Sequence, residues 1–413
     1  MTFFPQTYKM PNKYFKLILG PISSGKTTEL NRLANRYNSI GKTIVCLHAS
    51  EDKEDMPIKR ERFDFIESSR AVDELMSCLK MPSIINADII MLDAIHLLED
   101  SYEFITEIIN KPGHQIAVIA TACDSTLGRR SYSHIEKLIS FADSVEKLRG
   151  ICPFHGNGVI VPSVFTKYSN ERKKDGDIYS VCRSHAIYDI KYLEKNPDEK
   201  KGHLELIMGS MFSGKTTEAM RRVNLYSSFG KKVMAINHEI NKRYGSDVIH
   251  SHDKNELNNC YSLSDLFQIY EYLRKEYDES DVIFIEEVQF FQSAYDFIRN
   301  SVDIDKKIVI AVGLDGDYKR EPFGETNRLV SFADDYVKLH ALCSICCDGT
   351  PAPFTMRINK ENANVVAVGG IDDYKGVCRK CFDINQNGDK SIDGIAMNLL
   401  ERNFNKEQES SYY

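Results

Sequence analysis

The sequence predicts an α/β fold with two tandem parallel-sheet domains, each followed by a small cysteine-bearing subdomain. Short apolar runs alternate with helical patterns along the chain, and this alternation is typical of parallel strands joined by helices. One glycine-rich motif occurs twice, at residues 20–29 and 209–218, and two Cys-x-x-Cys or Cys-x-x-His pairs follow each copy. Such a repeat fixes the domain count before any finer assignment. In a chain of 413 residues, two repeats of about 190 residues match the usual size of domains.

The second copy of the motif predicts a phosphate-binding loop. It follows the apolar run 203–208 and opens a helical pattern, which is the order of strand, turn and helix that such a loop requires. Backbone N–H groups of its small residues can surround a phosphate, and the helix N-terminus adds partial positive charge. Lys215 can reach the β- and γ-phosphates of ATP, and the Thr216 hydroxyl can bind Mg²⁺. The expected nucleotide ligands in this loop are Gly209, Ser210, Met211, Phe212, Ser213, Gly214, Lys215, Thr216 and Thr217.

The first copy of the motif predicts a second loop of the same kind. It follows the apolar run 14–19, and both helical patterns end at a glycine followed by a lysine. This agreement indicates a tandem duplication of a P-loop, RecA-like domain. A possible second nucleotide site would use Gly20, Gly25, Lys26, Thr27 and Asp93.

Further strands and boundaries follow from the same patterns. Buried strands are expected at residues 42–48, 88–92 and 115–121, with a helix over residues 69–79, and again at residues 232–237, 281–285 and 307–312. A charged, breaker-rich segment marks the linker between the repeats. The expected units are a degenerate P-loop domain (14–150), its degenerate zinc-ribbon subdomain (151–192), the linker (193–202), a P-loop domain (203–340), its zinc-ribbon subdomain (341–382) and a polar tail (383–413).

The composition narrows the classes of function. A hydrophobic content of 42% supports sizeable cores, and a formal charge of −7 argues against a surface that coats nucleic acid. No apolar run approaches the roughly 20 residues that cross a membrane, and no signal-peptide pattern opens the chain. We therefore expect a cytoplasmic protein with no membrane or nucleic-acid partner. The 11 cysteines fit metal binding in a reducing compartment better than disulfides.

Two sets of metal ligands are predicted. Cys343, Cys346, Cys378 and Cys381 form two Cys-x-x-Cys pairs, the usual arrangement for a structural, tetrahedral Zn²⁺ site. In the first repeat, each second cysteine is replaced by histidine, and Cys152, His155, Cys182 and His185 keep four competent ligands. Cys347 is off this spacing. Unmetallated thiols in turns are the alternative.

The chemistry of transfer is expected at the end of one strand. Residues 282–285 lead into Glu286 and Glu287, and a carboxylate at this point beside a phosphate loop is where a Mg²⁺-linked acid sits in phosphate-loop ATPases and kinases. The adjacent carboxylate can serve as a base. In the first repeat the matching residues are Asp93 and Ala94, and alanine cannot accept a proton. His96 is an alternative base, but an extended chain would point it as Ala94 points.

Together these residues resemble the zinc-containing P-loop thymidine kinases of animals, bacteria and large DNA viruses. The resemblance covers residues 203–382 and rests on Gly-x-Met-Phe-Ser-Gly-Lys-Thr-Thr-Glu, Glu-Val-Gln-Phe-Phe, Leu-Asp-Gly…Pro-Phe-Gly, Val-Gly-Gly-x-Asp-x-Tyr and the cysteine pairs. It implies transfer of the ATP γ-phosphate to the 5′-hydroxyl of thymidine. Glu287 would be the base, Lys215 and Arg243 would contact phosphates, and Glu286 and Gln289 would join the ATP and Mg²⁺ ligands. A lasso-like loop on the zinc ribbon would close the thymine pocket. The implied pocket residues are Met211, Phe290, Leu314, Tyr318, Phe323, Thr355, Val368 and Tyr374.

The resemblance also bears on assembly and regulation. The family forms oligomers, often tetramers, and is commonly inhibited by dTTP. The first repeat is therefore expected to be a structural or regulatory partner, with two chains making a pseudo-tetramer. Two departures stand against the family pattern, because Glu286 and Asn241 occupy positions that usually carry aspartate.

Other functions stay open at this point. Glu286 and Asn241 favour a nucleotide-responsive binding protein without transfer activity. Main-chain recognition of the base also leaves room for a deoxynucleoside kinase of shifted base preference. A nucleic-acid-dependent ATPase that grips DNA with its ribbons would need a basic surface, which the net charge does not suggest.

Overall fold

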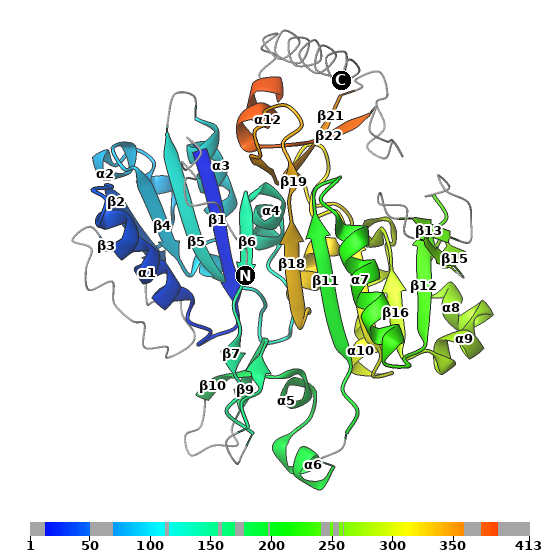
Figure 1. The fold of residues 1–413 in the computed structure, drawn as a ribbon. Coiled ribbons are helices and arrows are strands. Elements are labelled where there is room, and N and C mark those ends of the chain that lie inside the picture. Colours follow the sequence, from blue (N-terminus) through cyan, green and yellow to red (C-terminus); the bar gives the residue numbers. More distant parts are fainter. Residues whose placement is uncertain are drawn as a thin grey trace, which may run out of the picture.

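Two parallel six-stranded sheets stand side by side in the computed structural model (Figure 1). The structure describes residues 13–49, 69–111, 115–155, 159–169, 177–196, 199–240, 248–250, 256–258, 260–358 and 373–386. Within them, no helix combines the length and apolar character needed to traverse a bilayer.

The first sheet has the strand order β3-β2-β4-β5-β1-β6. All its pairings are parallel, and the central strands are buried almost throughout because helices cover both faces. Its strands are β1 (Lys13–Gly20), β2 (Ile44–Ala49), β3 (Ser69–Val72), β4 (Ile89–Asp93), β5 (Ile116–Cys123) and β6 (Ser144–Lys147). Its helices are α1 (Lys26–Asn38), α2 (Pro82–Ile85), α3 (Ser101–Asn110) and α4 (Ser133–Phe141).

The second sheet has the equivalent order β15-β12-β16-β17-β11-β18. Its strands are β11 (His203–Gly209), β12 (Val233–His238), β15 (Cys260–Leu263), β16 (Val282–Ile285), β17 (Ile308–Gly313) and β18 (Asp335–Leu339). Its helices are α7 (Lys215–Ser228), α8 (Gln268–Tyr272), α9 (Arg274–Glu279), α10 (Ala294–Asp303) and α11 (Thr326–Val330), and β13 (Val248–His250) and β14 (Glu256–Asn258) form a separate hairpin. The six strands expected between residues 42 and 312 are confirmed, with ends shifted by one or two residues.

One expected helix is wrong. Residues 69–79 do not form a helix, because Ser69–Val72 add a parallel edge strand to β2 and only Met76–Cys78 make a short 3-10 turn. The helical spacing of apolar residues in this stretch arises where an edge strand meets a turn, so Val72, Leu75 and Cys78 all reach the core without a continuous helix.

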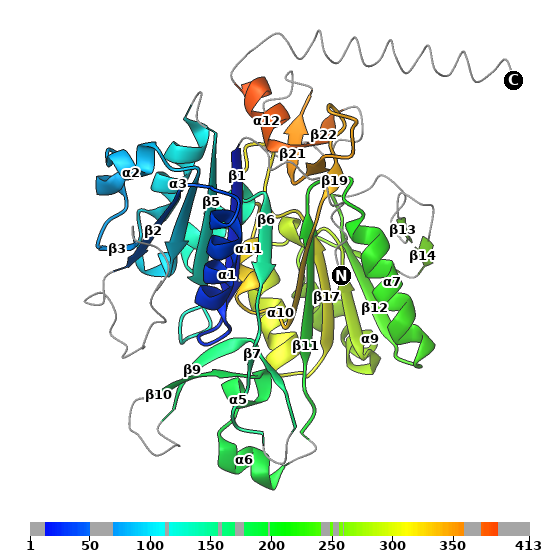
Figure 2. The ribbon, with the colours of Figure 1, turned by 60° about the vertical axis from the view of Figure 1, so that its left-hand side comes forward.

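Each sheet leads into a small subdomain, and the two subdomains lie at opposite ends of the molecule (Figures 1 and 2). The first contains β7 (Gly150–Ile151), β8 (Pro162–Ser163), β9 (Phe165–Ser169), β10 (Asp177–Val181), α5 (Arg183–Ile187) and α6 (Ile190–Lys195). The second contains β19 (Ala341–Leu342), β20 (Pro351–Ala352), β21 (Phe354–Arg357), β22 (Tyr374–Val377) and α12 (Arg379–Gln386). Helix α6 thus enters the stretch expected as linker, and α12 enters the stretch expected as tail.

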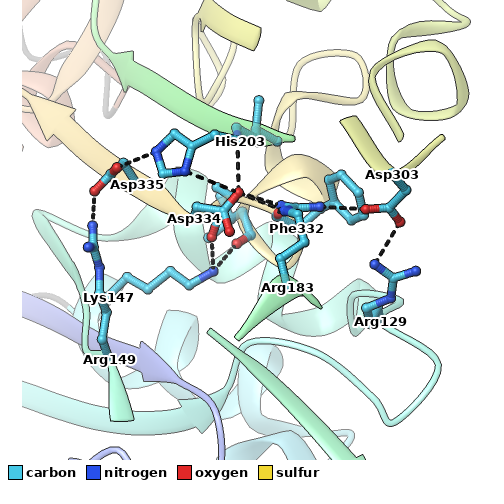
Figure 3. Close-up of polar contacts among 12 residues, drawn as sticks. Arg129, Lys147, Arg149, Arg183, His203, Asp303, Phe332, Asp334 and Asp335 are labelled. Atoms are coloured by element: carbon cyan, nitrogen blue, oxygen red, sulfur yellow. Dashed lines mark hydrogen bonds and ion pairs between the residues drawn. The ribbon is translucent and has the colours of Figure 1, made fainter. Parts of the chain in front are cut away.

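The two repeats share one core. The edge strands β6 and β18 contact each other, and one cluster of buried apolar side chains extends through both repeats. Figure 3 shows Arg183 of the first repeat at this boundary: its guanidinium donates to Asp303 and Asp334 and lies 4.3 Å from the centre of the Phe332 ring. Since Arg183, Asp303 and Phe332 are almost completely buried, the repeats form a single packed unit.

Candidate functional site

The phosphate loop of the second repeat joins β11 to α7. Gly209 and Gly214 adopt positive φ angles of 149° and 80°. A side chain at position 209 is excluded, because a Cβ atom there would lie 2.1 Å from the Leu339 carbonyl oxygen. The ammonium of Lys215 donates to the Ser210 carbonyl at 2.8 Å. Desolvation lowers the pKa of Lys215, and the carboxylates of Glu287 and Glu286 oppose this shift.

Glu286 and Thr216 have the geometry of a cation site. The Thr216 hydroxyl donates to Glu286 Oε1 at 2.7 Å, and the other oxygen, Oε2, is buried and accepts no hydrogen bond within the described part of the chain. Burial, together with the nearby Glu287, raises the pKa of Glu286 to about 8. A hydroxyl beside a carboxylate with an unpartnered oxygen suits the hard oxygen chemistry that Mg²⁺ prefers. The longer glutamate side chain therefore still reaches Thr216.

Glu287 stands at the end of β16 in a left-handed backbone conformation, with φ 53° and ψ 45°. Such a conformation costs a non-glycine residue about 1 kcal/mol and is concentrated at functional sites. The amide of Gln289 donates to Glu287 Oε2 at 2.5 Å, and its oxygen accepts the Leu314 N–H at 3.1 Å. Gln289, expected among the ATP ligands, thus connects the candidate base to the loop that begins at Leu314.

Two of the aromatic residues expected in the pocket contact each other, and the phosphate loop contacts the second subdomain. Phe290 meets Phe323 edge to face, with ring centres 5.5 Å apart. The Met211 N–H donates to the Thr355 hydroxyl at 2.9 Å, so the phosphate loop is joined to β21. Arg243, Val368 and Asn241 lie outside the described residues.

Tyr318 and Tyr374, the other two aromatic residues expected in the pocket, share a neighbour that sequence reasoning missed. The Arg357 guanidinium lies 5.3 Å from the Tyr318 ring and 6.0 Å from the Tyr374 ring. Arg357 is buried, two residues after Thr355 on β21 and directly paired with Tyr374 on β22. That alternate position in the strand is the signal that could have identified it.

The first repeat has the same backbone arrangement around a different residue set. Lys26 donates to the Pro21 carbonyl at 2.6 Å, and the Thr27 hydroxyl donates to Asp93 at 2.9 Å. Ala94 has φ 58°, which matches Glu287, but it offers no carboxylate. The conformation is therefore retained where the base is missing.

The extended geometry assumed for His96 is wrong. Residues Ile95–Leu97 form a 3-10 turn, and His96 Nδ1 accepts the Cys123 N–H at 3.2 Å. Its ring also packs edge-on against Tyr132. His96 therefore helps to join β4 to β5.

Comparisons with known proteins agree with this geometry. A family model described as thymidine kinase matches residues 13–186 and 202–382. The chain belongs to the thymidine kinase family. A thymidine kinase of Oryza sativa subsp. japonica is 40% identical over 183 residues, which cover 44% of this chain and 66% of the rice protein. Thymidine kinase a of Arabidopsis thaliana is 40% identical, covering 45% of this chain and 76% of that protein. The thymidine kinase of Variola virus is 37% identical, covering 44% of this chain and 97% of that protein.

Two solved structures align weakly. The crystal structures of a DNA replication initiation factor and of flagellar accessory protein FlaH from Methanocaldococcus jannaschii have sequence identities of 18% and 12% and TM-scores of 0.21 and 0.26. They cover 36% and 41% of this chain, and 43% and 79% of those chains. TM-scores this low support no conclusion about the fold of this chain.

Both predicted sets of metal ligands are brought together in this member of the thymidine kinase family. In each set the ligand atoms all lie within 4.8 Å of one another. Such a spacing fits the coordination of a single tetrahedral Zn²⁺. Hydrogen bonding by Cys182, aided by His185, lowers the pKa of the Cys152 thiol to about 3. Cys347 is exposed and bonds to the Ser344 carbonyl, apart from the cluster.

His238 is a further residue that sequence reasoning missed. It ends β12, and its ring lies 5.7 Å from the Phe290 ring and 4.7 Å from the Phe291 ring. Partial burial lowers its pKa. The His238 ring packs against Phe290, one of the residues expected in the pocket. Its position at the carboxyl end of a central strand was the available signal.

Proposed function

We propose that the second repeat transfers the γ-phosphate of ATP to the 5′-hydroxyl of thymidine. The proposal rests on Glu287, which follows the Glu286–Thr216 pair and is joined by Gln289 to the loop at Leu314. A carboxylate in this position can accept the proton of the attacking hydroxyl. Glu287 acts as the general base, and its left-handed backbone turns it away from the metal-linked residue before it.

The phosphate loop supplies positioning and charge. Its backbone N–H groups and Lys215 hold the triphosphate, and Arg243 contributes a second cation. Mg²⁺, held by Thr216 and Glu286, would neutralise charge on the phosphate oxygens. The aromatic pair Phe290 and Phe323 bounds the thymine, and main-chain groups near Met211 and Leu314 recognise its edge.

The first repeat is proposed to be a duplicated copy that has lost transfer activity. Ala94 cannot serve as the base. The first loop still binds a nucleoside triphosphate, because Lys26, Thr27 and Asp93 make the same contacts as their counterparts in the second repeat. Equilibrium dialysis with labelled ATP tests this occupancy. We expect two nucleotides bound per wild-type chain and one per chain in Lys26→Ala.

We also propose an oligomeric state, an inhibitor, a location and a metal content for the chain. Two chains associate into a pseudo-tetramer, dTTP inhibits the reaction, the protein resides in the cytoplasm, and both cysteine-bearing subdomains bind structural zinc. If sedimentation showed only a monomer and that monomer had full activity, the proposed pseudo-tetramer would be contradicted.

The deciding experiment is ATP-dependent phosphorylation of thymidine by the wild type, Glu287→Gln and Lys26→Ala. We expect activity in the wild type and in Lys26→Ala and its loss in Glu287→Gln. An inactive wild type that still binds ATP and zinc would favour the nucleotide-responsive binding protein. Equal or better activity with another deoxynucleoside would assign a shifted base preference.

A further inference from the structure

A buried hydrogen-bond cluster joins the first repeat to the loop that begins at Leu314. The Ser140 hydroxyl, at the end of α4, donates to the Asp315 carbonyl at 2.5 Å. The Asn327 amide donates to the same carbonyl at 2.9 Å, to the Ser140 hydroxyl at 2.7 Å and to the Glu136 carbonyl at 2.9 Å. Ser140 and Asn327 are 1% exposed and Asp315 is 3% exposed, so water does not compete for these bonds.

The side chain of Asp315 is anchored to the same helix. Its carboxylate forms a 2.8 Å ion pair with Lys338, whose side chain is only 1% exposed. The Lys338 ammonium also donates to the carbonyls of Ile139 and Ala142, at 3.0 and 2.9 Å. The carbonyl and the carboxylate of Asp315 are therefore both tied to the carboxyl end of α4.

The end of this loop, at Arg320 and Glu321, also contacts the first repeat. The Arg320 guanidinium lies 4.7 Å from the centre of the Phe141 ring. The Tyr102 hydroxyl donates to Glu321 at 3.4 Å, and the Asp317 N–H donates to the Glu321 carbonyl at 2.9 Å. Residues 315–321 thus form a closed turn that contacts the first repeat on both sides, while Arg320 also contacts Phe382 of its own repeat at 4.3 Å.

The near side of the loop leads to the candidate base. Leu314 precedes Asp315 and donates its N–H to Gln289, which donates in turn to Glu287. A displacement of Asp315 would therefore alter Leu314 and, through Gln289, the setting of the carboxylate.

One part of the cluster is reproduced on the other side of the boundary: Lys147 pairs with Asp124 at 2.8 Å and donates to the carbonyls of Val330 and Ala333, as Lys338 does with Asp315, Ile139 and Ala142. The Ser140 and Asn327 hydrogen bonds have no such counterpart among the described residues. The sequence Ser-Phe-Ala-Asp occurs at residues 140–143 and again at residues 331–334. Ser331, the counterpart of Ser140, donates to the Arg328 carbonyl in its own repeat. Glu136 occupies the position that corresponds to Asn327. Within the described residues, the Ser140 and Asn327 hydrogen bonds are therefore made only to the loop of the second repeat, which carries the candidate base.

We propose that the first repeat positions the nucleoside loop of the second repeat, and that Ser140 is the positioning residue. The inference rests on the proposed function for the role of that loop. Ser140 touches neither substrate. It acts through Asp315 on Leu314, and so affects the thymidine site more than the phosphate loop.

Ser140→Ala tests the inference, with Ser331→Ala as the matched control. Loss of one buried hydrogen bond corresponds to about 1 kcal/mol, or about a fivefold change in an equilibrium. We expect about a fivefold rise in KM for thymidine with KM for ATP unchanged, and faster amide exchange in residues 314–325. Ser331→Ala should leave all three values at those of the wild type. Asn327→Ala removes the same connection from the second repeat and should reproduce the effect if Ser140→Ala lowers the yield of folded protein.

Amide exchange in residues 314–325 tests the positioning of the loop even in a protein without transfer activity, whereas the KM values require that activity. Exchange rates in residues 314–325 that are identical in Ser140→Ala, Asn327→Ala and Ser331→Ala would overturn the inference, as would equal increases in KM for both substrates. Faster exchange confined to Ser140→Ala and Asn327→Ala, in a protein that phosphorylates no nucleoside, would support the positioning of the loop and remove the proposed function.

Discussion

Arg183 and Arg379 occupy equivalent positions in the two repeats, and each reaches across the boundary to a phenylalanine of the other repeat. The Arg183 guanidinium lies 4.3 Å from the Phe332 ring centre, and the Arg379 guanidinium lies 4.5 Å from that of Phe141. Each arginine also donates to the main-chain carbonyl of that phenylalanine. The subdomain of each repeat thus contacts the α/β domain of the other.

Removing one of these arginines should weaken the whole molecule. Arg379 is 2% exposed and its guanidinium donates to Asp143 at 2.7 Å. Because Arg379→Ala leaves a buried carboxylate without its cation, we expect the free energy of unfolding to fall by about 3–5 kcal/mol. Urea unfolding followed by circular dichroism measures the change.

An exposed arginine provides the control for that experiment. Arg221 pairs with Glu218 on the surface of α7, with its side chain 63% exposed. Arg221→Ala should change the free energy of unfolding by about 0.5 kcal/mol or less. Equal effects of the two substitutions would show that the cross-repeat contact contributes nothing to stability.

Loss of the candidate base should abolish transfer without abolishing binding. Glu287→Gln keeps the shape of the side chain and its contact with Gln289 but removes the proton acceptor. We expect kcat to fall by about 10²–10⁴-fold, with ATP affinity unchanged in isothermal titration calorimetry. A variant that retains more than a tenth of the wild-type kcat would exclude Glu287 as the base.

Zinc content should separate the two ligand sets. We expect two zinc ions per chain by plasma mass spectrometry, one fewer in Cys378→Ser and one fewer in His185→Ala. Cys347→Ser should keep both, because Cys347 lies outside the cluster of four thiols. One zinc in the wild type that is insensitive to His185→Ala would restrict metal binding to the second repeat.

The free energy of unfolding should depend on pH through His340. Burial, aided by the charge of Lys338, lowers the pKa of His340 to about 4 from its ordinary value of 6.5. The proton therefore binds the unfolded chain more tightly, and stability falls as the pH drops from about 6.5 towards about 4. His340→Gln should flatten this fall by about 2 kcal/mol between pH 7.0 and pH 5.0. Urea unfolding at pH 7.0 and pH 5.0 measures it, and parallel curves for wild type and variant would contradict the assignment.

Local patterns in the sequence predicted the parts of this molecule that are built locally. The two glycine-rich loops, the buried strands and the spacing of Cys343 and Cys346 each depend on a few neighbouring residues. The prediction of a helix over residues 69–79 was wrong because an edge strand and a turn place apolar side chains at helical spacing. Prediction also failed for His96, whose direction is set by the 3-10 turn that follows Ala94.

Contacts between distant segments were beyond sequence reasoning. Arg183 and Arg379 directly follow the cysteines Cys182 and Cys378, yet only the cysteines have a recognisable spacing. Ser140 gave no signal, because its partner Asp315 lies 175 positions away and belongs to the other repeat. Which side chains face each other across the boundary depends on how two complete sheets pack.

The contacts of Arg183 and Arg379 also bear on how natural selection acts on this gene. If the second repeat carries the reaction, as proposed, position 94 needs no carboxylate. Phe141 and Asp143 could not change so freely, because the neighbouring repeat depends on them for its own integrity. On the proposed function, the first repeat would then be retained as a scaffold, with its mutations purged at the shared boundary and tolerated around Ala94.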